Sequence, residues 1–105
     1  MPIDPTLEYD DQNIFAKILR REIPTEFLYE DEYAVAFRDI HPNAPTHVLV
    51  LPKGDYLDYE DFTGRATDDE IAGFFRAVRR VARTLGVEAS FRLITNNGAG
   101  AGQSV

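Results

Sequence analysis

The sequence predicts an α+β domain with an antiparallel sheet of about four strands, one short helix and one long helix. Two observations lead to this prediction: a sustained helical periodicity over residues 67–86, and short aromatic and β-branched runs bounded by turn residues. With 105 residues the chain has room for one domain of ordinary size. We divide it into an N-terminal arm, residues 1–12, and a domain, residues 13–105.

The first expected element is a short amphipathic helix that begins near Asn13. In the segment NIFAKILRRE the apolar residues recur at the spacing of one helical face, and Pro24 is expected to stop the helix. The residues before this segment include Pro2 and Pro5 and show little periodicity. We therefore interpret them as an arm.

A β-hairpin is the next expected element. Residues 27–30 and 33–38 are rich in aromatic and β-branched types, and the acidic residues Asp31 and Glu32 separate the two runs. The segment IHPNAPTH, with two prolines and an asparagine, then interrupts the strand pattern. We expect two strands joined by an acidic turn and followed by a break.

Residues 48–51 form a continuous apolar run that Pro52 closes. A strand that is apolar on both faces is typical of a buried position, so this run predicts a central strand. The following segment, residues 53–65, is acidic and rich in tyrosine and contains Gly54 and Gly64. We expect a loop or an irregular turn there.

The long helix is the best-defined element of the sequence. Thr67 and Glu70 have the spacing of a capping box, and apolar residues then follow helical spacing up to Gly86, which suits the position just after a helix. Residues 90–95 (SFRLIT) predict a further strand, and the remaining NNGAGAGQSV is a glycine-rich loop.

The composition, 44% hydrophobic and 28% charged, is that of a globular protein. The absence of cysteine excludes disulfides, thiolate zinc sites and a cysteine nucleophile. A net charge of −7 argues against a nucleic-acid partner, since duplex affinity depends on Lys and Arg.

No apolar run approaches the ~20 residues of a membrane span, and the first residues lack a signal-peptide pattern, so we expect a cytoplasmic protein without membrane contact. We interpret four arginines of the long helix as a solvated face, with a local basic patch left open: Arg76, Arg79, Arg80 and Arg83.

The glycine-rich loop could hold a phosphate group. Its alternate glycines permit positive φ angles and close approach of backbone N–H groups to an anion, and Asn96 and Ser104 add side-chain donors. It lacks the lysine of a P-loop and the following helix of a dinucleotide fingerprint. An ordinary flexible turn is the alternative.

A second candidate site surrounds Asp39, at the end of an expected strand. Its carboxylate could accept both hydroxyls of a ribose, with Phe37 and Ile40 offering an apolar slot for a base. A turn-forming aspartate is the alternative. His47, at the start of the apolar strand, could be catalytic or could be a hydrogen-bonded core histidine.

Three motifs in this order, IF..I..REIP, F.DI.P.APTH and GQSV, resemble the histidine-triad (HIT) family of nucleotide-binding hydrolases and transferases. The resemblance covers residues 13–105, and the branch most similar is that of the purine-nucleoside phosphoramidases. A complete member of the family would have five strands. The resemblance implies a hydrolase or transferase that acts on purine nucleoside 5′-phosphate derivatives, either phosphoramidates or anhydrides. It implies no metal or other cofactor, and a homodimer packed through the long helix and the strand near residue 93.

The resemblance also implies roles for individual residues. Asp39 matches the aspartate that binds the ribose, and His47 matches the separate histidine that supports the active site. The role of Arg38, where relatives often carry another polar residue, is left open. The residues matching the walls of the purine pocket are Ile14, Phe15, Ile18, Phe37 and Ile40. Those matching the contacts to the α-phosphate are Asn96, Gly102 and Ser104.

The sequence departs from the family at the nucleophile. In the family, GQSV leads into a strand of alternating histidines, of which the middle one attacks phosphorus; here the histidines are His41 and His47. His41 lies beside Pro42 in a turn and matches no histidine with that role. We therefore expect an incomplete family member, with the 105-residue chain itself nearly inactive. Two alternatives stay open: a non-catalytic nucleotide-binding or regulatory module, and a protein-interaction domain.

Overall fold

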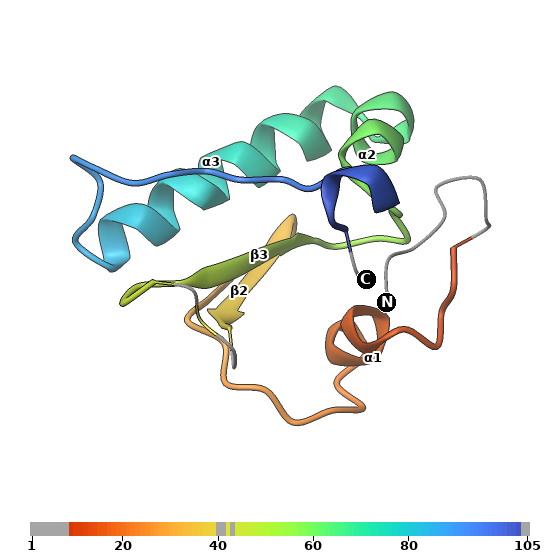
Figure 1. Cartoon of the computed structure of the whole chain (residues 1–105), viewed down its shortest axis with the longest axis horizontal. Helices are drawn as coiled ribbons and strands as arrows, with labels where there is room; N and C mark the ends of the chain where they lie inside the picture. The colour runs from red at the N-terminus through yellow and green to blue at the C-terminus, as the bar shows by residue number, and fades with distance from the viewer. Residues whose placement is uncertain (1–8, 40–41, 43, 104–105) are drawn as a thin grey trace.

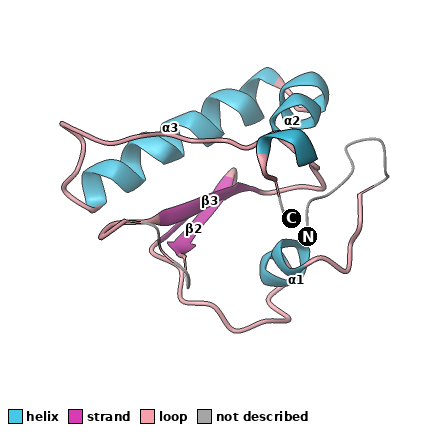
Figure 2. Cartoon of the chain, viewed as in Figure 1, coloured by secondary structure: helices cyan, strands magenta, loops and turns pink. Residues whose placement is uncertain are grey.

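The computed structural model describes residues 9–39, 42 and 44–103. Within them a three-stranded antiparallel sheet, in the order β1-β2-β3, packs with helices, as the α+β prediction required. Figure 1 shows α3 on one side of the sheet and α1 on the other, and Figure 2 shows the long loop between α3 and η1. The bounds are β1 Tyr29–Glu30, β2 Ala34–Arg38, β3 Val48–Pro52, α1 Ile14–Leu19, α2 Tyr59–Arg65, α3 Asp68–Thr84 and the 3-10 helix η1 Ala99–Ala101.

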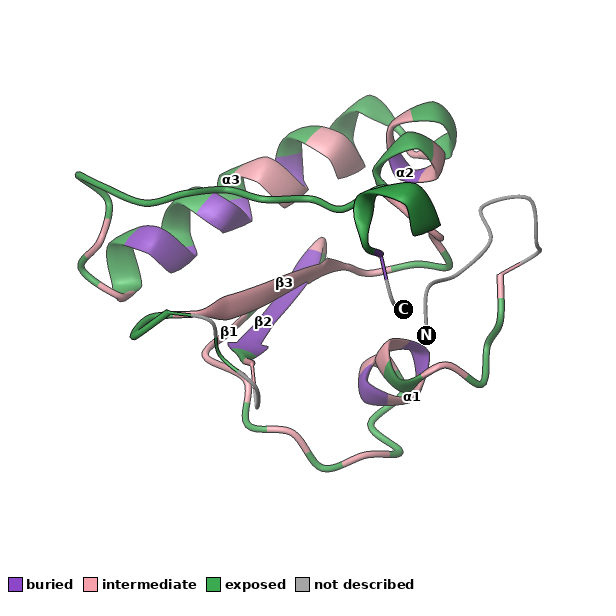
Figure 3. Cartoon of the chain, in the orientation of Figure 1, coloured by how far each residue is buried: buried purple, intermediate pink, exposed green. Residues whose placement is uncertain are grey.

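The strand at the centre of the described sheet is β2. Its register sets Ala36 opposite Tyr29 of β1 and opposite Val50 of β3, and its residues Ala34 to Phe37 are all buried. The residues of β3 are only half-buried, as the colours of Figure 3 show. The strand predicted at residues 48–51 is confirmed as β3. In the described sheet, however, β3 lies at an edge, and the central strand is β2, which has a strand partner along both edges.

The hairpin between β1 and β2 confirms the prediction of two strands around Asp31 and Glu32, although β1 is shorter than expected. The carboxylate of Asp31 accepts the backbone N–H groups of Tyr33 at 2.7 Å and Ala34 at 2.9 Å. It also accepts the hydroxyl of Tyr29 at 2.7 Å. An aspartate that bonds the backbone two and three residues ahead stabilises a tight turn, so Asp31 explains the position of the hairpin.

The long helix α3 confirms the capping prediction. The Thr67 hydroxyl accepts the N–H of Glu70, and the Glu70 carboxylate accepts the N–H of Thr67, both at 3.1 Å. Gly86 follows the helix with φ +72°, a conformation that glycine adopts at low cost. The buried face of α3 covers β2.

The first helix, α1, is shorter than the sequence indicated. Asn13 caps it by accepting the N–H of Ala16 at 2.8 Å, and the helix ends at Leu19, before Pro24. Arg21 adopts a positive φ of 62°, which lies outside the right-handed helical region and takes the chain out of the helix. The helix therefore ends through the left-handed conformation of Arg21, before the chain reaches Pro24.

The expectation of a loop over residues 53–65 was wrong in its second half, where α2 forms. Asp58 caps this helix by accepting the N–H of Asp61 at 2.8 Å. Acidic residues occupy its first turn and Arg65 its last, and charges in these positions stabilise a helix by interacting favourably with its dipole. The side chain of Arg65 bonds Asp61, four residues earlier, at 2.6 Å.

The strand expected at residues 90–95 is absent from the described structure, where this segment is an extended, exposed loop. Phe91, Leu93 and Ile94 are 50%, 59% and 62% exposed. A strand needs a hydrogen-bonded neighbour, and the ladders of the described sheet are β1-β2 and β2-β3. In the described part of the chain no helix is long and apolar enough to cross a membrane.

Candidate functional site

Asp39 and His47 meet where the paired strands β2 and β3 begin to separate. Asp39 follows β2 and His47 precedes β3, and antiparallel pairing brings the two positions together. The N–H of Asp39 donates to the carbonyl of His47 at 3.1 Å. His47 Nε2 lies 3.6 Å from Asp39 Oδ2, and both side chains are partly exposed. The structure thus joins two candidate residues that come from separate positions of the sequence.

An aromatic cluster adjoins this corner. The ring of Phe37, the residue two before Asp39, is 6% exposed and lies 6.4 Å from the ring of Phe15 in α1. The ring of Phe27 lies 6.3 Å from the ring of Phe37. The contact between the rings of Phe15 and Phe37 packs α1 against the end of β2.

The remaining residues of the expected purine pocket are distributed around α1. Ile18 is buried and Ile14 is 46% exposed, so α1 presents an accessible apolar residue at its start. Ile18 also lines a cavity of about 280 Å³ beside the helix. Ile40 and Ser104, two further predicted site residues, lie outside the described residues, as does His41. The cavity is lined by Ile18, Arg21, Ile23, Pro24, Thr25 and Phe27.

The glycine-rich loop forms a compact structure beside α2 (Figure 1). It contains η1, with positive φ angles of 84° at Gly98 and 89° at Gly102. The carbonyl of Gly98 accepts the N–H groups of Ala101 and Gln103, each at 3.1 Å. Asn96 and Gly102, the predicted phosphate contacts, are exposed. Asn96 and Gly102 therefore belong to a second group of candidate residues. This group is distant in sequence from Asp39 and His47, and the described hydrogen bonds of its loop are made within the loop and with the start of α2.

Two residues that hold this loop were missed by the sequence interpretation. Gln103 is 8% exposed, a buried polar residue of the described chain, and Asn97 bonds the backbone of α2. The sequence carries only a weak signal for either, because a polar residue in a glycine-rich stretch is ordinarily taken as solvent-exposed. Their partners lie about forty residues away, so local pattern could not identify the contacts.

The start of α2, to which the glycine-rich loop is hydrogen-bonded, contains the interacting side chains of Asp61 and Arg65. The hydrogen bond from Arg65 is the main cause that holds the pKa of Asp61 below its ordinary value, with the N–H of Leu57 adding to it. Asp61 therefore stays ionised and keeps the start of α2 bonded. In the ranges 9–39 and 44–103 no three His, Cys, Asp or Glu side chains gather closely enough to hold a metal ion.

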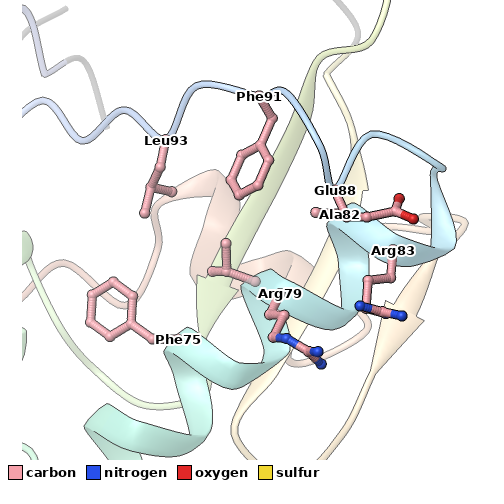
Figure 4. Close-up of a pocket in the computed structure, with 8 residues that line it drawn as sticks. Phe75, Arg79, Ala82, Arg83, Glu88, Phe91 and Leu93 are labelled. Carbon is pink, nitrogen blue, oxygen red and sulfur yellow. The ribbon is translucent and has the colours of Figure 1, made fainter.

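A second cavity, of about 320 Å³, lies between α3 and the extended segment after it. Figure 4 shows Phe91 and Leu93 reaching from that segment toward Phe75 and Arg79 of α3. The lining is mainly apolar, with charges at its rim. The lining residues are Phe75, Val78, Arg79, Ala82, Arg83, Glu88, Phe91 and Leu93.

Comparison with known proteins identifies close relatives. The model of the HIT domain matches residues 20–105. An uncharacterized HIT-like protein of Azospirillum brasilense is 55% identical over 98 residues, which are 92% of this chain and 80% of that protein. A HIT-like protein of Rickettsia prowazekii is 44% identical over the same length, 92% of this chain and 82% of its own. The structure of a HIT family hydrolase from Clostridium thermocellum matches with a TM-score of 0.79 and 38% identity, covering 91% of this chain and 84% of that one.

Proposed function

This chain belongs to the HIT domain family, and on that premise we propose that it binds a purine nucleoside 5′-phosphate derivative. The observation that carries the proposal is the junction of Asp39 and His47 beside the buried ring of Phe37. A carboxylate next to an apolar wall suits a ligand that has paired hydroxyls at one end and a flat aromatic base at the other.

The base and the ribose occupy the α1 side of the site in this proposal. Asp39 accepts the ribose hydroxyls, and the exposed Ile14 with Phe15 and Phe37 flanks the base. Ile18 and Ile40 complete the apolar wall, although Ile40 lies outside the described residues. The side chains of this wall are apolar, so they do not distinguish adenine from guanine by hydrogen bonding.

The α-phosphate lies against the glycine-rich loop. Asn96 and Gly102 are exposed there. The N–H groups of Gly98, Ala101, Gly102 and Gln103 bond within the loop. The side chain of Asn96 is therefore the proposed donor, and Gly102 allows a phosphate to approach closely because it has no side chain. Ser104, outside the described residues, is the third proposed contact. Contacts of this kind fix the phosphorus atom for attack.

The chemistry proposed is that of a nucleoside phosphoramidase-like hydrolase. A neutral imidazole nitrogen attacks phosphorus, a nitrogen–phosphorus bond forms, and the leaving group departs with a proton. Water then attacks the same phosphorus, releasing the nucleoside monophosphate and restoring the imidazole. His47 supports the site beside Asp39 in this scheme, and no histidine of the 105 residues has the place of the nucleophile. Activity is therefore proposed to need a histidine-bearing strand.

A homodimer is proposed through the second cavity. Phe91 and Leu93 are half-exposed or more and line this cavity together with Phe75 and Val78 of α3, and exposed apolar side chains that cluster in this way suit a contact with another protein. Arg79, Arg83 and Glu88 at its rim supply both signs of charge. A second copy of the chain is the occupant proposed.

Calorimetric titration of the chain with adenosine 5′-monophosphate, adenosine and inorganic phosphate tests the binding proposal. We expect the monophosphate to bind more tightly than adenosine, because it engages both groups of residues. Guanosine 5′-monophosphate in a parallel titration measures base preference. Absence of binding by every nucleotide would remove the proposed function.

A further inference from the structure

Both ends of the glycine-rich loop are tied to the turn that begins α2. Asn97 Oδ1 accepts the N–H of Glu60 at 2.8 Å, across 37 residues of sequence. Gln103 Nε2 donates to the carbonyl of Leu57 at 2.7 Å, across 46 residues. The two ties lie on either side of η1, so the intervening loop is held at both its entrance and its exit.

Gln103 also closes the loop on itself. The side-chain Oε1 of Gln103 accepts the backbone N–H of Gly98 at 2.6 Å. The backbone N–H of Gln103 donates to the carbonyl of Gly98. The side chain is nearly buried, with both its donor and its acceptor ends bonded. A buried amide whose polar atoms are satisfied selects one conformation, because breaking either bond leaves a buried group unpaired.

The loop needs such a constraint because of its composition. The segment GAGAG would populate many conformations if nothing held it, since glycine loses more backbone freedom on ordering than any other residue. The structure instead has defined positive φ angles at Gly98 and Gly102. A loop that is already ordered binds an anion without losing that freedom at the moment of binding.

The turn at the start of α2, to which the loop is hydrogen-bonded, is stabilised by hydrogen bonds of its own. Asp58 caps α2, and the carboxylate of Asp61 accepts the N–H of Leu57 at 2.9 Å. Arg65 bonds Asp61 and donates to the carbonyl of Asp55 at 2.6 Å. Leu57 and Glu60, which receive the two ties, therefore lie in a segment fixed by its own hydrogen bonds.

We propose that Asn97 and Gln103 are positioning residues that hold the glycine-rich loop, with the start of α2 as their support, in the shape that binds a nucleotide phosphate. This inference rests on the proposed function and extends it to residues that act through the loop. It assigns a role to the α2 turn as well, a segment that contains none of the proposed ligand contacts.

The test compares two ligands that differ by the phosphate. Calorimetry of the 105-residue chain measures the dissociation constants of adenosine 5′-monophosphate and adenosine for the wild type, Asn97→Ala and Gln103→Met. We expect each variant to bind the monophosphate about three- to tenfold more weakly, the scale of one lost neutral hydrogen bond. Adenosine binding should be unchanged, because the Asp39 corner is untouched.

A matched control removes a hydrogen bond of α2 that does not reach the loop. Thr63 donates to the carbonyl of Tyr59 at 2.8 Å, and Thr63→Ala should leave both dissociation constants unchanged. Backbone amide spectra of residues 98–102 provide a second measurement, with shifts expected in the Asn97 and Gln103 variants and not in the control. Asn97 is exposed, so Asn97→Ala decides the question even if Gln103→Met fails to fold.

The possible failures are distinguishable. A wild type that binds the monophosphate no more tightly than adenosine contradicts the proposed phosphate site and this inference together. A wild type that prefers the monophosphate, with the same preference in Asn97→Ala and in folded Gln103→Met, contradicts the inference alone. Equal weakening of both ligands would also contradict it, because that result indicates a general loss of structure.

Discussion

Tyr33 in the hairpin turn and Gly73 in the middle of α3 are in direct contact. A Cβ atom at Gly73 would overlap the ring of Tyr33 at Cγ, Cδ2 and Cε2. Gly73 is therefore a point of close approach between the hairpin and the long helix. A glycine inside a helix is otherwise unfavourable, and here the packing of the ring explains it.

Gly73→Ala should destabilise the chain by about 1–3 kcal/mol, the cost of overpacking a well-filled contact. Urea denaturation measures the free energy of unfolding. Gly64→Ala in α2 is the matched control, because no atom lies within 4 Å of its added Cβ. That change should be neutral or stabilising by up to about 1 kcal/mol. Equal effects at both positions would contradict the proposed contact.

Asp39→Ala should weaken nucleotide binding by about 1.5–3 kcal/mol, the scale of hydrogen bonds to a charged group. Titration with adenosine 5′-monophosphate and its 2′-deoxy analogue isolates the ribose contact. The wild type should prefer the ribonucleotide, and Asp39→Ala should lose most of that preference. If the variant still distinguishes the two ligands as well as the wild type does, Asp39 does not bind the ribose.

The 105-residue chain should hydrolyse adenosine 5′-phosphoramidate several orders of magnitude more slowly than the same chain extended by a histidine-bearing strand, because covalent catalysis needs a nucleophile. Release of adenosine 5′-monophosphate is the measurement. His47→Ala in the extended chain should reduce the rate without abolishing it. Equal turnover by the short and extended chains would show that the nucleophile has been misplaced.

The hairpin should lose stability in acid through Asp31. Burial acts to raise the pKa of this carboxyl, but hydrogen bonds from Tyr29, Tyr33 and Ala34 outweigh it and hold the pKa below its ordinary value. The ionised form therefore stabilises the fold fully above about pH 4, and this contribution disappears as the pH falls through the lower folded value. Thermal melts between acid and neutral pH measure the effect.

Asp31→Asn is the variant for that measurement. It should melt at a lower temperature than the wild type near neutral pH, and the difference should narrow in acid, where the wild-type carboxyl is protonated. Glu32→Gln, the neighbouring exposed acid of the turn, is the control and should follow the wild type. A constant difference between Asp31→Asn and the wild type at all pH values would exclude the ionisation of Asp31 as the cause.

Leu93→Arg should shift the proposed homodimer toward monomer by about tenfold or more in dissociation constant, because a charge would enter a desolvated apolar contact. Sedimentation equilibrium measures the association. Arg92→Ala changes the adjacent residue, which does not line the cavity, and should leave association intact. An unchanged dimer in Leu93→Arg, or a monomeric wild type, would rule out this interface.

The fold was predictable wherever local chemistry decides it. The capping box of Thr67 and Glu70, the terminal Gly86 and the Asp31 turn all depend on residues within a few positions of one another. The helix α2 was missed because the tyrosines and the two glycines of residues 53–65 were interpreted as turn residues, so the N-cap at Asp58 was not recognised. The strand expected at residues 90–95 did not form in the described structure because strand structure depends on a neighbour that its own sequence does not supply.

The sequence proposes residues for the candidate site, and the structure shows how those within the described residues are placed. Asp39, His47 and the loop residues Asn96 and Gly102 could be proposed from their motifs. That Asp39 lies against His47 follows from the β2-β3 register, and that the loop is held by Gln103 follows from a bond to Leu57. Neither contact joins residues that are close in sequence.

The sequence by itself determined the long capped helix and the hairpin, since these depend on spacing, backbone preference and side-chain chemistry. Tertiary structure alone decided that β2 is central, that Gly73 receives the ring of Tyr33, and that the glycine-rich loop is tied to the start of α2. The physical reason is that burial and long-range hydrogen bonds depend on which segments pack together. That arrangement is a property of the whole chain and not of any local window.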